Sequence, residues 1–199
     1  MIKRLIIVIV TLVLSVGCQT TTRVFDPDKP FHMDERYDYT DLKAVTEQMA
    51  RSIVTNLPIV SRNDQPVIII YGISNRTNEH IDTNALTEKV RTALTQTHKV
   101  RFINEDQRKN IEKEIAYQSG GLVNADTRIR LGRQIGAEYM LTGAITSITK
   151  EEGRGMRLKA RKVNYYKFNM ELTQLETSII EWSDEKEFAR EVAKPFIGW

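Results

Sequence analysis

Few residues in this chain have the type and spacing that catalysis or metal binding requires. The three histidines are His32, His80 and His98, and none has a second histidine or a cysteine at metal-ligand spacing. No nucleophile-elbow pattern surrounds a serine. Two glycine clusters, Gly120-Gly121 and Gly153-Arg154-Gly155, lack the lysine of a phosphate-binding loop and are interpreted as turns. The sequence therefore predicts a protein that is not an enzyme and uses no cofactor or metal.

Cys18 carries a definite chemical prediction. It is the only cysteine, so a disulfide within one copy is excluded. It follows two cations and an apolar run of about twelve residues, Leu5 to Val16, which is shorter than the ~20 residues of a membrane-spanning helix. This arrangement is typical of a secretory signal peptide, here over residues 1–17.

The residues that end this leader, Leu14-Ser15-Val16-Gly17-Cys18, resemble a bacterial lipobox, although Ser15 stands where leucine is usual. A lipobox cysteine is acylated, with palmitate among its acyl groups, and becomes the new N-terminus. We therefore expect Cys18 to anchor the mature chain in a membrane, and Gln19 behind it favours the outer membrane. The alternative is ordinary cleavage beside an incidental cysteine.

Composition places the rest of the chain among ordinary globular domains. The chain has 199 residues, a formal net charge of +3, 41% hydrophobic residues and 28% charged residues. This balance argues against a nucleic-acid-binding protein, which needs a concentrated positive face. The length that remains after the signal peptide suits one domain with a substantial core.

The chain order suggests a tether, a domain and a tail. Residues 18–40 are polar, contain Pro27 and Pro30 and show no periodicity, so they are interpreted as a short lipidated tether. Residues 41–190 form the expected globular domain and 191–199 its C-terminal tail. An alternative is that the four aromatic residues of the tether pack onto the domain; these are Phe25, Phe31, Tyr37 and Tyr39.

Hydrophobic periodicity predicts the secondary structure of the domain. The expected helices span 41–57, 83–94, 104–116 (with Ile111 and Ile115 inside) and 125–135, and the expected strands span 67–73, 100–103, 139–148, 163–175 and 179–187. The candidate N-caps are Thr40 or Asp41, Asp82 or Thr83, and Asn104, the last forming a capping box with Gln107. These elements predict a single α+β domain, a mixed β-sheet of about five strands with three to four helices packed mainly on one face.

Two polar segments are candidates for surface function. The segment Ser74–Asp82 follows a buried strand, a location often used for ligands, but we interpret Asn75, Asn78 and Asp82 as bonding local backbone. The alternative is that the segment Ser74–Asp82 has a functional role at the surface. The segment Lys150–Lys162 holds six cations and two anions at the position of a hairpin loop. It is either a docking element for an anionic partner, through Arg154 and Arg157, or a solvated loop.

One predicted strand has a regular two-residue alternation. Tyr166, Phe168, Met170 and Leu172 alternate with a second, mostly polar set: Tyr165, Lys167, Asn169 and Glu171. We expect the second set to point outward.

Several motifs together resemble one family. They are Ile73-Ser74-Asn75-Arg76-Thr77-Asn78-Glu79-His80-Ile81-Asp82, Tyr117-Gln118-Ser119-Gly120-Gly121, Arg130-Leu131-Gly132, Gly136-Ala137-Glu138-Tyr139-Met140-Leu141-Thr142-Gly143, Tyr165-Tyr166-Lys167-Phe168 and Ile180-Glu181-Trp182-Ser183-Asp184-Glu185-Lys186-Glu187. In this order, they are similar to the penicillin-binding protein activator lipoproteins of the LpoB type. The tether is shorter and the basic hairpin longer than in the best-known members.

The resemblance implies a function in cell-wall biogenesis. It implies a monomeric outer-membrane lipoprotein that faces the periplasm, binds a bifunctional penicillin-binding protein and stimulates both of its peptidoglycan-synthesis activities allosterically. The expected contact residues are Tyr117, Gln118, Tyr165, Lys167, Asn169, Glu171, Arg154 and Arg157. The alternatives are a lipoprotein subunit of an export pore of the curli-secretion kind and a hydrolase or lectin that acts on peptidoglycan directly.

Overall fold

The computed structural model describes residues 24, 26, 29–32, 34, 36–124, 126, 136–152 and 159–195. The signal peptide, Cys18, Arg154, Arg157 and nearly all of the expected helix 125–135 lie outside the described residues. The chain divides into two units, Met1–Phe31 and His32–Trp199. In the first, the described backbone has one turn, in which Lys29 N–H donates to the Asp26 carbonyl (3.2 Å). The remaining description concerns the second unit.

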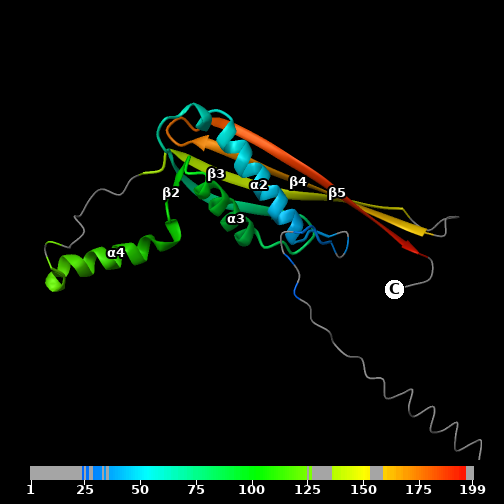
Figure 1. Cartoon of the computed structure of the whole chain (residues 1–199), viewed down its shortest axis with the longest axis horizontal. Helices are drawn as coiled ribbons and strands as arrows, with labels where there is room; N and C mark the ends of the chain where they lie inside the picture. Colours follow the sequence, from blue (N-terminus) through cyan, green and yellow to red (C-terminus); the bar gives the residue numbers. More distant parts are fainter. Residues whose placement is uncertain are drawn as a thin grey trace, which may run out of the picture. The chain divides into compact units, whose positions relative to one another are not determined.

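A five-stranded mixed sheet forms the frame of the domain (Figure 1), with strand order β2-β1-β3-β4-β5. The strands are β1 (Val67–Arg76), β2 (Arg101–Phe102), β3 (Tyr139–Glu152), β4 (Lys159–Gln174) and β5 (Ile180–Pro195). β1 runs parallel to β2 and β3, whereas β3, β4 and β5 form an antiparallel meander. This arrangement confirms the predicted single α+β domain.

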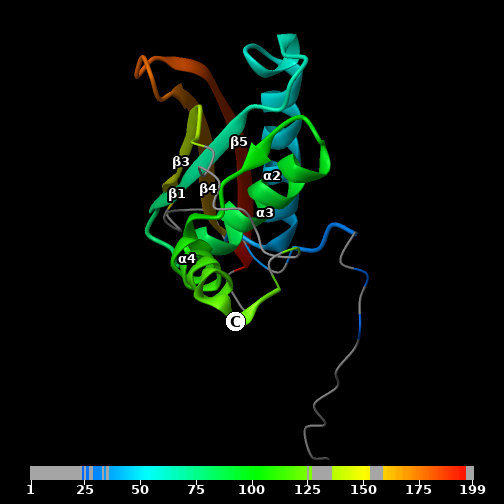
Figure 2. The ribbon, with the colours of Figure 1, turned by 90° about the vertical axis from the view of Figure 1, so that its left-hand side faces the viewer.

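Two helices cover one face of this sheet (Figures 1 and 2). α2 (Tyr39–Thr55) and α3 (Thr83–Gln96) pack against each other, and they contact β5 and β1, respectively. Their apolar stripes meet the inward side chains of the strands, as the periodicity predicted. The core includes Met49, Ile53, Leu86, Leu94, Ile68, Leu141, Ile145, Phe168, Met170 and Leu172, all of which are essentially buried.

The third helix, α4 (Arg108–Tyr117), does not contribute to this core. We expected Ile111 and Ile115 to be inside, but Ile111 is 42% exposed and no residue of α4 is buried. The expected capping box is also wrong, because Asn104 makes no side-chain cap and opens a short turn, η2 (Glu105–Gln107), instead. α4 packs mainly against η2 and the turn η3 (Gln118–Leu122), which explains why its apolar residues lack core neighbours.

Helix α2 begins at Tyr39, two residues before the predicted start at residue 41. The N-cap of α2 is Asp38, whose carboxylate accepts hydrogen bonds from the Thr40 and Asp41 N–H groups. The Asp41 side chain, at position N3, accepts in turn from the Asp38 N–H, which completes a capping box. Tyr37 packs against the domain, so the alternative of a docked tether holds for this aromatic residue. At the other end, β5 continues to Pro195, so the first residues of the expected tail belong to the sheet.

The segment 74–82 has the structural role that we preferred. The first residues of this segment, as far as Arg76, belong to β1, and a turn follows. Asn75 fixes that turn, because its side chain accepts from the Thr77 N–H (2.9 Å) and donates to the Glu79 carbonyl (2.8 Å). Asp82 caps α3, as expected. Within the described chain, Asn78 makes no such bond.

Candidate docking face

The side of the sheet opposite α2 and α3 forms a face that we call the open face. On β4, the alternation is as predicted, because Tyr166, Phe168, Met170 and Leu172 are buried on the helix side. Tyr165 and Lys167 are exposed on the open face, while Asn169 and Glu171 are half-buried there. The structure therefore brings these four predicted residues together.

A bulge in β1 adds two further polar residues to the open face. The register between β1 and β3 shifts between Ile70 and Ile73, where Gly72 has φ +91°. Because one extra residue inverts the alternation of a strand, Ser74 and Arg76 point to the open face instead of toward the helices. The sequence analysis missed this bulge, although an isolated glycine inside an apolar strand run is its usual signal.

Cross-strand pairing arranges the open face in rows. Ser74 lies beside Ala144, which pairs with Asn169, and Arg76 lies beside Thr146, which pairs with Lys167. A third row joins Thr142 to Glu171 and Ser183, which extends the face onto β5. The sequence analysis had no means to find Thr142 or Thr146, because nothing in a single strand reveals the register of its neighbour.

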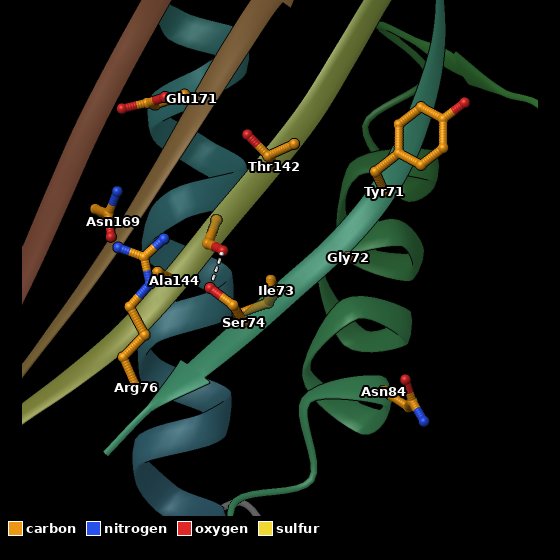
Figure 3. A pocket seen from close by; sticks show the side chains of 11 residues that line it. Tyr71, Gly72, Ile73, Ser74, Arg76, Asn84, Thr142, Ala144, Asn169 and Glu171 are labelled. Carbon is orange, nitrogen blue, oxygen red and sulfur yellow. Dashed lines mark hydrogen bonds between the residues drawn. The ribbon is translucent and has the colours of Figure 1, made fainter.

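Three shallow hollows line this face. The first, of about 520 Å³, lies beside the bulge and is shown in Figure 3. A second, of about 540 Å³, lies over β4 and β5, between Arg76 and Glu185. The third, of about 450 Å³, is more apolar and lies between Ile148, Tyr165 and Ala189. Together they make the open face uneven, with hollows that could accommodate side chains of a partner protein.

The charges of the open face are mixed. Lys167 pairs with Glu185 across the strands (3.4 Å). The guanidinium of Arg76 forms no hydrogen bond or ion pair with any residue in the described part of the chain. This cation is therefore available to an external anion or acceptor.

On the opposite side, a short segment before α2 is fastened to β5; we call this segment, residues 32–38, the N-terminal strap. Arg190 holds it, since its guanidinium donates to Asp38 (2.7 Å), to Asp41 (2.6 Å), and to the Asp34 and Arg36 carbonyls. The Arg190 side chain is only 11% exposed. His32 Nδ1 also contacts this guanidinium and the Asp38 carboxylate.

His32, Asp38 and Asp41 have the proximity of a metal-ligand set. The guanidinium of Arg190 already lies among them and supplies the positive charge that their carboxylates need. The arrangement is therefore that of a structural ion-pair cluster. Burial raises the pKa of Asp41, whereas at Asp38 burial is outweighed by hydrogen bonds from Arg190 and His32, which lower its pKa to about 2.

Aromatic packing completes the strap. Tyr37 lies against Tyr166 and Phe188, which stack at a centroid distance of 5.0 Å. The Tyr166 hydroxyl donates to Glu79 (2.5 Å) and accepts from the Tyr37 N–H (3.1 Å). Burial, together with the neighbouring Glu79 carboxylate, raises the pKa of Tyr166. The strap is therefore part of the folded domain.

Two further predicted contact residues, Tyr117 and Gln118, do not line the hollows of the open face. Tyr117 is exposed at the end of α4, and Gln118 follows it, with its amide donating to Glu114 (2.9 Å). These two residues belong to α4 and η3, which pack mainly with η2.

The basic segment 150–162 is a hairpin, but its ends are strand and not loop. Arg161 pairs with Glu191 (2.6 Å) and Lys162 with Glu151 (3.3 Å), so part of its positive charge is neutralised within the sheet. Arg154 and Arg157 lie between the two strand ends, outside the described residues. Among the residues that the structure covers, no helix is both long and apolar enough to span a membrane.

Comparison with known proteins relates this fold to solved structures. The chain is similar to the C-terminal domain of LpoB from Salmonella enterica, with 19% identity and a TM-score of 0.47 over 74% of this chain and 98% of that one. The LpoB domain from Escherichia coli matches over the same shares, with 17% identity and a TM-score of 0.46. Lipoprotein GNA1162 from Neisseria meningitidis matches at 14% identity over 63% of this chain and 83% of that one, with a TM-score of 0.38. No curated protein sequence matches this chain.

A family model gives the assignment. The model described as peptidoglycan-synthase activator LpoB matches residues 41–188, which include α3, the strands β1 to β4 and the greater part of α2 and β5. The match agrees with the family that the sequence motifs resemble. The chain therefore belongs to the LpoB family of peptidoglycan-synthase activators.

Proposed function

We propose that this protein is an outer-membrane lipoprotein whose domain docks onto a bifunctional penicillin-binding protein and activates it. Membership of the LpoB family supports the activator role. The leader and Cys18 support the lipid anchor, because the short apolar run ends at the only cysteine. Catalysis belongs to the synthase in this proposal, and the activator contributes binding alone.

The open face is the docking surface in this proposal, and its side-chain arrangement is the observation that carries it. Tyr165, Lys167, Asn169 and Glu171 stand in one line on β4, with Arg76 beside them. The opposite side of the sheet is occupied by α2, α3 and the N-terminal strap. The open face therefore presents hollows, an exposed aromatic side chain and charges of both signs to a partner. Binding there would leave the core undisturbed.

Activation follows from differential affinity. A protein that binds both states of a synthase equally shifts no equilibrium, however tightly it binds. The open face must therefore fit the active conformation of the synthase better than the inactive one. A tenfold increase in the active-to-inactive ratio requires about 1.4 kcal/mol of such preference.

Charge reversal on the open face tests the docking surface. Lys167→Glu places a carboxylate beside Glu185 and Glu187, and Asn169→Glu, a separate variant, places one beside Glu185 and Glu171. We expect each variant to lower the stimulation of glycan polymerisation by the purified synthase about tenfold. The matched control is Arg51→Glu, which changes an exposed cation on α2, on the other side of the sheet. Unchanged stimulation by both open-face variants would show that another surface docks.

Fractionation tests the anchor separately. In Cys18→Ser the acylated thiol is lost, so the protein should move from the outer-membrane fraction to the soluble periplasmic fraction. The same variant purified without the membrane should still stimulate a purified synthase. An unaltered membrane location in Cys18→Ser would contradict the proposed anchor.

A further inference from the structure

The hollow beside the bulge of β1, which we call the bulge pocket, gathers polar side chains that the fold does not use. Arg76, Asn84, Thr142, Asn169 and Glu171 all line it. None of their side-chain polar groups has a hydrogen bond or ion pair with another residue in the described part of the chain. They come from β1, α3, β3 and β4 and line one hollow of about 520 Å³, with Asn84 across β1 from Thr142, Asn169 and Glu171 (Figure 3).

The bulge is the feature that assembles this pocket. Without the extra residue at Gly72, Arg76 and Ser74 would point toward the helices and leave the pocket without its cation. Bulges recur where a strand must redirect a side chain beside a functional site. The same bulge leaves Tyr71 at the rim, 69% exposed, in the position labelled in Figure 3.

The chemistry of the lining restricts the ligand. Amides, a hydroxyl and a carboxylate suit a ligand with many hydroxyl groups, because each can donate to or accept from a diol. An exposed aromatic ring at the rim offers an apolar face to the C–H side of a sugar. Among the lining residues, Arg76 is the cation and Glu171 the anion, so a ligand with a single negative charge suits the pocket better than a multiply charged anion such as phosphate.

We propose that the bulge pocket binds a short glycan that carries a carboxylate. The Arg76 guanidinium takes the carboxylate in a bidentate contact. Asn84, Thr142, Asn169 and Glu171 take the hydroxyl and acetamido groups, and Tyr71 stacks on a sugar ring. The volume of the pocket, about 520 Å³, falls within the usual ~300–1,000 Å³ of small-molecule sites.

This proposal is separate from the proposed docking of a synthase, although Arg76, Asn169 and Glu171 contribute to both surfaces. Its test is direct binding by the full mature chain, purified in detergent and free of any synthase. The probes in isothermal titration calorimetry are a hyaluronan tetrasaccharide, which has glucuronate carboxylates, and chitotetraose, which is uncharged. Synthase stimulation is measured without glycan, so the two proposals can fail independently.

We expect the carboxylated tetrasaccharide to bind saturably and the uncharged one to bind at least about tenfold more weakly. Arg76→Met and Tyr71→Ala should each weaken binding of the carboxylated glycan about tenfold. The controls are Arg51→Met on α2 and Tyr165→Ala at the far end of the open face, and both should bind as the wild type does. Arg76→Lys keeps the charge without the planar fork, so it should recover only part of the affinity.

Four results would overturn the proposal. They are the absence of saturable binding, equal binding of both tetrasaccharides, displacement of the glycan by acetate at the same concentration, and wild-type affinity in Arg76→Met. Because Arg76 is an exposed residue without partners in the described chain, this variant should keep the thermal unfolding midpoint of the wild type, which makes its result interpretable.

Discussion

Arg190 shows how one side chain can fasten a segment that lies far away in sequence. Its guanidinium serves two carboxylates and two backbone carbonyls, and its side chain is nearly buried. A buried cation with this many partners is an obligatory part of the local structure, since its removal leaves carboxylates without compensation.

Replacing Arg190 should therefore destabilise the domain strongly. We expect Arg190→Met to lower the free energy of unfolding by about 3 kcal/mol, because Asp38 and Asp41 lose their shared partner. The measurement is urea denaturation followed by circular dichroism. The control is Arg161→Met on β4, whose pair with Glu191 is half exposed and should contribute less than about 1 kcal/mol. Equal losses in the two variants would contradict the role of Arg190.

Asp38 makes the strap sensitive to acid. Its pKa is about 2 in the folded protein against an ordinary value of 3.8, so its contribution to stability is complete above pH 4. That contribution disappears as the pH falls from about 4 towards 2, because the unfolded chain then takes up the proton more readily. The raised pKa of Asp41 acts in the opposite direction and at higher pH, because its folded-state carboxyl already takes up a proton above the ordinary value of 3.8.

Comparison with Asp38→Asn isolates this carboxylate. Asparagine also caps helices, so the variant keeps the side-chain cap of α2, while it removes the charge and the second carboxylate oxygen, which contacts Arg190 and His32. We expect the wild type to lose more stability than Asp38→Asn between pH 4 and 2, by about 1 kcal/mol after solvent screening. Urea midpoints at several pH values provide the measurement. Parallel pH profiles for the two proteins would show that Asp38 has no such role.

At the scale of elements, the close approach of β3 and β4 depends on Gly143. A methyl group at this position would lie 2.8 Å from the Asn169 carbonyl and 3.1 Å from the Met170 side chain. The Asn169 carbonyl belongs to the backbone and cannot move aside as a flexible side chain can. With a methyl group at position 143, β3 and β4 must therefore separate locally.

We therefore expect Gly143→Ala to destabilise the domain by about 2 kcal/mol, in the range of overpacked core substitutions. Gly120→Ala is the matched control, because a methyl group there meets no atom within 4 Å. Thermal unfolding of both variants distinguishes them. A wild-type midpoint for Gly143→Ala would show that the two strands adjust freely.

The elements also show which features a single sequence can reveal. The stripe of Met49 and Ile53 predicted α2, and the alternation from Tyr165 to Leu172 predicted both faces of β4, because burial imposes a period on the chain. The cap at Asp38 was missed because a nearby threonine and aspartate also fit the cap preference. The bulge at Gly72 and the grouping of Arg76 with Thr142 depend on the register between strands, which leaves no periodic signal in either strand.

At the scale of the whole molecule, the strap shortens the proposed tether. The second unit begins at His32, so thirteen residues, Gln19 to Phe31, remain between the proposed anchor and the domain. Fully extended, they span ~45 Å, and as a flexible coil they span roughly 20 Å. The reach of the domain toward a synthase therefore depends on these residues alone.

Shortening this stretch should impair activation in the cell. Deleting six of the thirteen residues removes about 20 Å of maximum reach, so cross-linking of the protein to the proposed synthase partner in cells should fall. Replacing the same six residues by a Gly/Ser sequence of equal length should preserve the cross-linking yield. Both purified proteins should stimulate a purified synthase equally. Undiminished cross-linking by the shortened chain would show that reach is not limiting.

The attachment of residues 32–38 to β5 also decides how the domain responds to mechanical tension. A pull that travels along the chain from the proposed lipid anchor enters the domain at His32 and is resisted first by the bonds of Arg190 and by the packing of Tyr37. The first turn of α2 lies behind these contacts, so it is shielded from a force that would otherwise unwind it residue by residue. The force acts instead on the edge strand β5, which is hydrogen-bonded along its length to β4.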